Sequence, residues 1–380
     1  MPQCGGDKTD MNKIRILHTA DLHLDSPFEA LPGNKAAVRR AEQRRLLTSL
    51  TELARREEAD MVLLSGDLLD STGAYHETGE ELVRSLGSIS VPVFIAPGNH
   101  DFYSPKSPYA RLELPDNVYI FKSPKIECIE LPELSARVYG AAFTENRSGP
   151  MLQGFKAGKT EGCYNILCMH GEVGNPDSPY NPISEAQLAD SGADYAALGH
   201  IHKASGLKKA GNTWYSWPGC PEGRGFDETG EKTVSMIELE GDRCSLSTFS
   251  IASRKYEVLD VDITDTDPLL AVNSSLPADT VRDVYRIILK GQTGGSPDLN
   301  ELYEKLSGMF FELQLRDETR LRRSVWEKAG EDSLKGIFLA KLLERFKSAA
   351  DDDERKKLEQ AARWGLAALE NGEEVIKHED

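Results

Sequence analysis

The chain has 380 residues and a formal net charge of −17 at pH 7, because 62 Asp and Glu outnumber 45 Lys and Arg. Its 39% hydrophobic and 28% charged residues can form a packed core, which excludes a disordered chain. The length suggests two or three domains. The negative charge argues against nonspecific binding to nucleic acid, although a local basic groove remains compatible with it.

Neither a membrane span nor an export signal is predicted. No stretch approaches the roughly 20 consecutive apolar residues that a membrane helix needs, and the polar leader, residues 1–12, lacks the apolar core of a signal peptide. We therefore expect a cytoplasmic protein without membrane contact. The six cysteines form no C-x-x-C pair, and we interpret them as reduced, mostly buried thiols.

After the leader, short apolar runs alternate with amphipathic segments. Residues 13–19, 61–64 and 91–95 resemble strands, and the segments between them, about 35–58 and 79–87, have helical spacing. Each apolar run ends in polar residues. Such alternation predicts βαβ units, in which the loops at the carboxyl ends of the strands gather at one edge of a sheet.

Two further strand-like runs, 164–169 and 195–198, lead directly into histidines. A hairpin is then predicted over 233–251, around the turn residues Gly241 and Asp242. We place a domain boundary near Ser253, which gives a first domain over residues 13–253.

Beyond this boundary the pattern changes twice. The segment 254–330 is predicted to be a small α+β domain, with strands at 256–263, 284–290 and 310–315 and a helix at about 299–306. The segment 331–380 is predicted to be helical, with an acidic break at 351–353.

Polar side chains that bind metals are concentrated at the ends of the predicted strands. Five of the eight histidines lie there. The candidate ligands are Asp21, His23, Asp67, Asn99, His170, His200 and His202. Imidazole, carboxylate and amide ligands suit divalent ions such as Mn²⁺, Fe²⁺ or Zn²⁺. Seven ligands are too many for one tetrahedral ion and fit two ions that share a carboxylate and a water, a centre that hydrolyses phosphate esters. The alternative is a set of unrelated polar loop residues.

The order of the motifs, D-L-H, G-D, G-N-H-D, H-G-E and G-H-I-H, resembles the calcineurin-like metallophosphoesterases. The segments T-A-D-L-H-L-D at 19–25, S-G-D-L-L-D at 65–70, P-G-N-H-D at 97–101 and E-G-R-G-F at 222–226 resemble the DNA-repair exonuclease branch, with its SbcD-like and YhaO-like nucleases. This resemblance implies an α/β fold: a two-sheet sandwich core with a small capping domain and C-terminal helices.

The resemblance also implies ligand sets, which we carry over residue by residue. Asp21, His23, Asp67 and His202 would hold one ion, and Asp67, Asn99, His170 and His200 the other, with Mn²⁺ as the favoured metal. His100 would face the scissile phosphate and stabilise or protonate the leaving oxygen, with Asp101 orienting its ring. The alternative for His100 is a packing role. Arg224, on the loop after the last motif, is expected to meet substrate phosphate.

Several other features have two interpretations. The arginine pairs at 39–40, 44–45 and 55–56 are more consistent with a solvated helix face than with DNA contacts, and Trp214 and Trp217 with packing rather than base stacking. The helices of 331–380 either pack within the chain or, as the resemblance implies, bind the coiled coil of an SMC-like ATPase.

The sequence therefore predicts a two-metal phosphodiesterase, a DNA exonuclease or endonuclease in DNA repair that works with an SMC-like ATPase. One alternative is a phosphoesterase for small molecules or phosphoproteins, because the same ligands serve all of these reactions. Another is a structural component that regulates an ATPase. A homodimer is left open.

Overall fold

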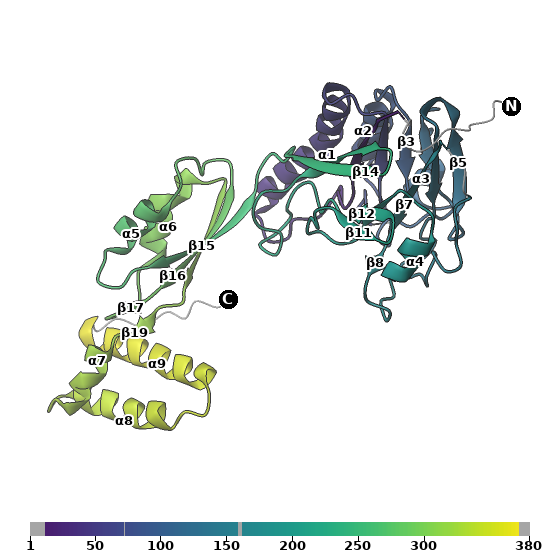
Figure 1. The fold of residues 1–380 in the computed structure, drawn as a ribbon. Helices are drawn as coiled ribbons and strands as arrows, with labels where there is room; N and C mark the ends of the chain where they lie inside the picture. The colour runs from purple at the N-terminus through teal and green to yellow at the C-terminus, as the bar shows by residue number, and fades with distance from the viewer. Residues whose placement is uncertain (1–11, 72, 159–161, 372–380) are drawn as a thin grey trace. The chain divides into compact units, whose positions relative to one another are not determined.

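The computed structural model describes residues 12–71, 73–158 and 162–371 (Figure 1). The chain divides into two compact units, unit 1 (Met1–Lys255) and unit 2 (Tyr256–Asp380). Cys4 and most of the polar leader lie outside the described residues. No helix among those that are described is long and apolar enough to cross a membrane.

The first sheet of unit 1 has the strand order β14-β13-β1-β2-β3-β4. Its strands are β1 (Ile14–Thr19), β2 (Met61–Leu64), β3 (Val93–Ile95), β4 (Val118–Ile120), β13 (Val234–Glu240) and β14 (Arg243–Phe249). The strands β1 to β4 run parallel, and the hairpin β13–β14 joins the sheet antiparallel to β1. The carboxyl ends of β1, β2 and β3 therefore lie at the same edge.

The second sheet has the order β11-β12-β10-β7-β6-β5. Its strands are β5 (Glu127–Leu131), β6 (Ala136–Gly140), β7 (Tyr164–His170), β10 (Tyr195–Gly199), β11 (Lys208–Ala210) and β12 (Thr213–Ser216). The central strands β6, β7, β10 and β12 are parallel, and an antiparallel strand flanks them at each side.

The two sheets pack face to face, as the α/β sandwich prediction required. One buried cluster takes residues from both sheets, such as Ile16 and Phe94 from the first and Ile166 from the second. The helices α1 (Gly33–Arg56) and α2 (His76–Gly87) pack on the outer face of the first sheet. Shorter elements complete unit 1: α3 (Pro108–Arg111), η2 (Pro132–Leu134), β8 (Glu172–Val173), β9 (Pro182–Ile183) and α4 (Glu185–Asp190).

Several of the strands that sequence analysis missed in unit 1 are short or half-exposed. β4 has three residues, none fully buried, and β5 buries only its last residue, Leu131. Such strands show neither a continuous apolar run nor clear alternation. The helix α2 also begins at His76, three residues before the predicted start.

Unit 2 contains a three-stranded parallel sheet, with the order β15-β16-β18. Its elements are β15 (Tyr256–Asp262), α5 (Pro268–Ser275), β16 (Val284–Lys290), β17 (Gln292–Thr293), α6 (Leu299–Leu306), η3 (Ser307–Met309), β18 (Glu312–Asp317) and β19 (Arg320–Leu321). The sequence analysis expected one helix and an α+β arrangement here. The structure adds α5, so helices alternate with parallel strands.

The helical end of the chain belongs to unit 2. It comprises α7 (Arg323–Glu327), η4 (Lys328–Gly330), α8 (Leu334–Ser348) and α9 (Asp352–Asn371). Trp326, Leu339 and Ala362 form a small buried cluster there. Ion pairs connect α9 to the sheet region: Arg320 lies 2.5 Å from Asp352 and 3.3 Å from Glu359, and Arg363 lies 3.3 Å from Asp317. The acidic break separates α8 from α9, although Asp352 already belongs to α9.

Candidate metal centre

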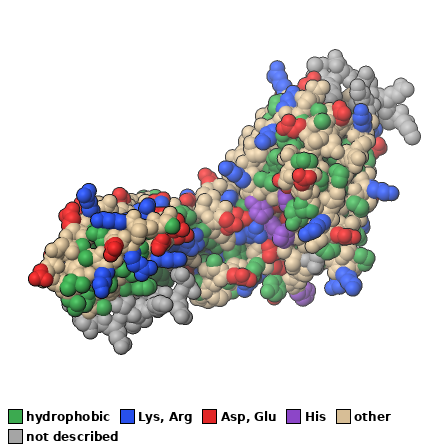
Figure 2. All heavy atoms as spheres, turned by 90° about the horizontal axis from the view of Figure 1, so that it is seen from below, with side chains coloured by type: hydrophobic (Ala, Val, Ile, Leu, Met, Phe, Trp, Pro, Cys, Tyr) green, Lys and Arg blue, Asp and Glu red, His purple; other side chains and the backbone are tan. Residues whose placement is uncertain are grey.

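The parallel strands bring the candidate ligands of unit 1 to one place. Asp21 and His23 follow β1, Asp67 follows β2, Asn99 follows β3, His170 ends β7, and His200 and His202 follow β10. Ligand atoms of three groups converge within 4.8 Å: Asp21, His23 and His202; His23, Asp67 and His100; and Asp21, Asp67 and His170. Figure 2 shows histidine side chains gathered on a face of unit 1.

One side of the centre, which we call the first position, is formed by Asp21, His23 and His202. The Nε2 atoms of His23 and His202 face each other at 3.2 Å, and Nε2 of His202 lies 4.0 Å from Oδ1 of Asp21. The Nδ1 atoms point the other way, to Asp70 (3.1 Å) and Glu228 (2.6 Å). Because an ionised carboxylate only accepts hydrogen bonds, each Nδ1 carries the proton and each Nε2 presents a lone pair.

The other side, the second position, is formed around His170. Its Nε2 lies 3.0 Å from Oδ1 of Asn99 and 3.3 Å from Oδ2 of Asp67. Its Nδ1 donates to the main-chain carbonyl of Ser65 at 2.9 Å, which again leaves Nε2 as a ligand atom. The ring of His200 lies 5.2 Å from that of His170, and its main-chain N–H donates to Asp21.

Lone pairs and carboxylate oxygens that face one another at these distances repel unless a proton or a metal ion lies between them, so the arrangement can bind a cation. The donor set combines imidazole, carboxylate and amide oxygen, and it therefore fits divalent cations of the borderline-to-hard class. Asp67 lies between the two positions: its Oδ2 is 3.7 Å from Nε2 of His23 and 3.3 Å from Nε2 of His170. A carboxylate in this place can serve both.

The electrostatics of the centre are strongly coupled. Burial, reinforced by Asp67, raises the pKa of Asp21 to about 7 against the attraction of His170. Burial opposes ionisation of Asp67 too, but His170 and His23 outweigh it and lower its pKa. Burial would lower the pKa of His170, which Asp67 and Asp21 instead raise to about 9, whereas burial lowers that of His23 to about 4. Binding of a cation here must therefore displace protons.

The loops that carry the ligands adopt unusual backbone conformations. Asp21, His23, Asp67 and His200 have φ values of 55°, 45°, 51° and 100°, in the region that non-glycine residues rarely occupy. Strained backbone conformations of this kind cluster at functional sites, where the surrounding structure holds them in place. The approach of the loops is also close: a Cβ on Gly199 would lie 1.9 Å from the Ser65 carbonyl oxygen.

His100 and Asp101 lie beside the centre, but not in the expected relation. The ring of His100 is 4.8 Å from that of His23, and its Nδ1 contacts the carbonyl of Asp70 at 3.0 Å. The carboxylate of Asp101 is fully buried, and it accepts hydrogen bonds from the N–H groups of Leu68 (2.7 Å) and Gly98 (2.8 Å). Asp101 therefore braces the loops after β2 and β3, and Asp70 orients the ring of His100.

The structure adds two residues to which the sequence analysis gave no role, Asp70 and Glu228. Asp70 ends the S-G-D-L-L-D motif and Glu228 lies two residues after the E-G-R-G-F motif, but only their contacts with His23 and His202 reveal their role. Arg224 lies between them: it contacts Asp70 at 3.0 Å and Glu228 at 2.9 Å. The guanidinium expected to meet substrate is therefore already ion-paired.

Other sequence interpretations have mixed outcomes. Arg39 is not on a solvated face but fully buried, where it contacts Glu42 at 2.8 Å and Glu222 at 3.1 Å. Trp217 packs as expected: it is 6% exposed and donates from Nε1 to the carbonyl of Gly171. Trp214 donates to the carbonyl of Asp242.

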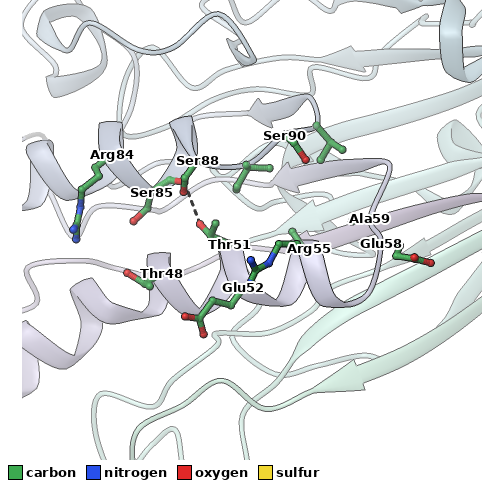
Figure 3. A pocket seen from close by; sticks show the side chains of 13 residues that line it. Thr48, Thr51, Glu52, Arg55, Glu58, Ala59, Arg84, Ser85, Ser88 and Ser90 are labelled. Atoms are coloured by element: carbon green, nitrogen blue, oxygen red, sulfur yellow. Dashed lines mark hydrogen bonds between the residues drawn. The ribbon is translucent and has the colours of Figure 1, made fainter.

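A cavity of about 610 Å³ lies elsewhere in unit 1 (Figure 3). It is lined by α1, α2 and the turns that follow them, and the hydroxyl of Thr51 donates across it to the carbonyl of Ser85 at 3.1 Å. Its lining contains none of the candidate ligands, because it lies at the ends of the helices that lead into β2 and β3 rather than at the carboxyl ends of the strands.

Comparisons with known proteins agree with this geometry. The family model described as calcineurin-like phosphoesterase matches residues 14–204, just over half of the chain. The uncharacterized metallophosphoesterase YhaO of Bacillus subtilis is 28% identical over 278 residues, which are 69% of this chain and 66% of that protein. The DNA double-strand break repair protein Mre11 of Aeropyrum pernix is 26% identical over 69% of this chain and 67% of its own length. A component of the SbcCD nuclease of B. subtilis is 25% identical over 60% of this chain and 66% of its own length. The chain thus spans about two thirds of the length of these relatives.

Proposed function

The chain belongs to the calcineurin-like phosphoesterase family, whose members use a dimetal centre. We therefore propose that this metal-dependent hydrolase holds two divalent ions and cleaves phosphodiester bonds in DNA. The observation that carries the proposal is the convergence of the Nε2 atoms of His23, His202 and His170 on the carboxylates of Asp21 and Asp67. Every Nδ1 in this set is committed to another acceptor, so the Nε2 atoms are left for ligation.

When bound, two divalent ions supply an activated water and charge stabilisation for in-line displacement at phosphorus. The residues of this chain then have separate tasks. Asp21, His23 and His202 form the first position, and His170 and Asn99 the second, where we also assign His200. Asp67 serves both. We propose Mn²⁺ as the metal, since the mixed imidazole and oxygen donors suit it.

His100 is assigned to the leaving group. Its ring is exposed beside His23, and the carbonyl of Asp70 accepts from Nδ1, which leaves Nε2 as the ring nitrogen that can act on a ligand. From there it can stabilise or protonate the leaving oxygen of a bound phosphodiester. Asp101 supports this position indirectly, because its carboxylate fixes the N–H of Gly98 next to Asn99.

DNA as the substrate is supported by the relatives, one of which is named for DNA double-strand break repair and another as part of a nuclease. A phosphoesterase for small molecules or phosphoproteins is the rival, because the ligands alone do not select a substrate. The experiment compares release of nucleotides from linear duplex DNA with turnover of bis(p-nitrophenyl) phosphate, both in Mn²⁺. Turnover of the small ester without any cutting of duplex or single-stranded DNA would contradict the proposal.

We also propose that the helices α8 and α9 bind a coiled-coil ATPase of the SMC type. Leu334 and Ile337 at the start of α8 are 69% and 55% exposed, although both are large apolar side chains. A helix with an exposed apolar face gains stability when a partner covers it.

The variant with Leu334→Ser and Ile337→Ser tests this partner while the buried cluster around Leu339 stays intact. It should keep its metal and its turnover of the small ester but lose co-purification with an SMC-type ATPase of the same cell. A matched substitution at Val281, which is equally exposed on unit 2 at 61%, should change neither. Retained co-purification would refute the docking role.

A further inference from the structure

The loop between β12 and β13, residues 218–230, carries two charged side chains that reach the metal centre. Glu228 is only 5% exposed, and the side chain of Arg224 is 22% exposed. The loop is itself held in the core, because the buried carboxylate of Glu222 accepts from Arg39 at 3.1 Å and from the N–H of Ser253 at 2.8 Å. Its charged side chains therefore project from a fixed backbone.

Glu228 is held through both oxygens. Its Oε1 accepts from Nδ1 of His202 at 2.6 Å, and its Oε2 accepts from the N–H of Arg224 at 2.8 Å. A carboxylate fixed in this way allows one orientation and one tautomer of the imidazole, the one with its Nε2 lone pair turned toward His23.

Arg224 connects Glu228 to the other imidazole of the first position. Its Nη2 donates to Oε1 of Glu228 at 2.9 Å, and its Nη1 donates to Oδ1 of Asp70 at 3.0 Å. The same Oδ1 of Asp70 accepts from Nδ1 of His23 at 3.1 Å. One guanidinium thus offsets the repulsion between two carboxylates, each of which orients a histidine.

We propose that Arg224 and Glu228 are positioning residues that pre-form the first metal position, and that Arg224 does not bind the substrate phosphate. The inference rests on the proposed two-metal function, and it concerns only the first position. At the second position the orienting group is of another kind, because His170 is held by the main-chain carbonyl of Ser65.

The first test titrates Mn²⁺ into the metal-free, full-length protein by calorimetry. Glu228→Ala should weaken one of two binding steps by about 10- to 100-fold and leave the other unchanged. Glu228→Gln should lose less, because its amide oxygen still accepts from Nδ1. Asp227→Ala removes an exposed neighbouring carboxylate and serves as the control. Equal weakening of both steps, or of neither, overturns the proposal.

A second readout needs no metal. In the protein with ¹⁵N-labelled histidine, at a pH high enough to give the neutral ring, NMR should find His202 as the Nδ1–H tautomer in the wild type and shifted toward Nε2–H in Glu228→Ala. An unchanged tautomer overturns the role of Glu228. If the wild type binds fewer than two ions, the proposed function fails, and this measurement decides the positioning role by itself.

Arg224→Lys separates positioning from substrate binding, because it keeps the positive charge but lacks the two-sided geometry that bridges Asp70 and Glu228. We expect it to weaken the same Mn²⁺ step as Glu228→Ala, with the KM for bis(p-nitrophenyl) phosphate unchanged once Mn²⁺ is saturating. A raised KM with unaltered Mn²⁺ affinity would return Arg224 to the substrate site.

Discussion

The two positions of the proposed metal centre are built by different means. At the first, the histidines are oriented by side-chain carboxylates, Asp70 and Glu228, which lie on loops. At the second, His170 is oriented by the carbonyl of Ser65, directly after a buried strand. Single side-chain substitutions can therefore remove the groups that orient the histidines of the first position, whereas the main-chain acceptor of His170 Nδ1 moves only with the backbone.

Asp67→Ala should have the largest effect, because this carboxylate lies between the two positions and can serve both of them. We expect loss of both ions, measured by mass spectrometry of the metal content, and hydrolysis reduced to background. Asp116→Ala, at an exposed turn, is the control. One retained ion would mean that Asp67 serves a single position.

Gly199→Ala should have the next largest effect, and it tests whether the two positions bind their ions independently. The added Cβ would lie 1.9 Å from the Ser65 carbonyl oxygen and 2.8 Å from Nδ1 of His170, so the backbone there must shift. We expect loss of the second ion and of activity, with Mn²⁺ affinity at the first position retained. Gly149→Ala, where a Cβ meets nothing within 4 Å, should behave as the wild type. Loss of both ions would mean that the two positions are not independent.

His100→Ala should keep both ions, because the contact of this residue with Asp67 is made by its main-chain N–H at 2.9 Å. Turnover of DNA should fall by roughly 10² to 10⁴-fold. Hydrolysis of bis(p-nitrophenyl) phosphate should fall less, since p-nitrophenolate leaves without a proton. A lost ion would instead make His100 a ligand, in keeping with its grouping with His23 and Asp67.

The smallest effect concerns the support of the second position, and it depends on pH. His18 is fully buried, where it contacts the Tyr195 hydroxyl at 2.8 Å and the Ser65 hydroxyl at 3.2 Å. Burial lowers its pKa to about 3, against the opposing hydrogen bond at Leu198. Because the unfolded histidine takes up a proton below about pH 6.5 and the folded one does not, stability should be lost as the pH falls from 6.5 toward 3.

We expect His18→Gln to lose less stability than the wild type between pH 6.5 and pH 5. The difference should be up to about 2 kcal/mol, since each pH unit of unmatched protonation changes the free energy of unfolding by about 1.4 kcal/mol. Urea denaturation of the metal-free protein at both pH values measures it. Parallel losses in the two proteins would show that His18 is protonated in the folded state.

The ends of the parallel strands were predictable, because an apolar run followed by Asp or His indicates both the strand and a candidate ligand at its end. The sequence analysis therefore named Asp21, Asp67 and His170 as candidate ligands, and the structure brings their side chains together. Glu228 was not, because its partner His202 is 26 residues away and no periodicity connects the two. Asp101 was given the wrong neighbour for a similar reason: adjacency in sequence suggested His100, while the fold turned its carboxylate toward main-chain N–H groups.

The buried arginine of α1 has a practical consequence for dividing the chain. Arg39 shares Glu42 with Arg254, whose Nε lies 2.8 Å from that carboxylate, and it shares Glu222 with the N–H of Ser253. A fragment that ends after β14, the last strand of the sandwich, would lack Arg254. The buried carboxylates of Glu42 and Glu222 would then have one cation, Arg39, instead of two. The gene should therefore be divided after Lys255, where the last residues of the linker still complete the interior of the catalytic half.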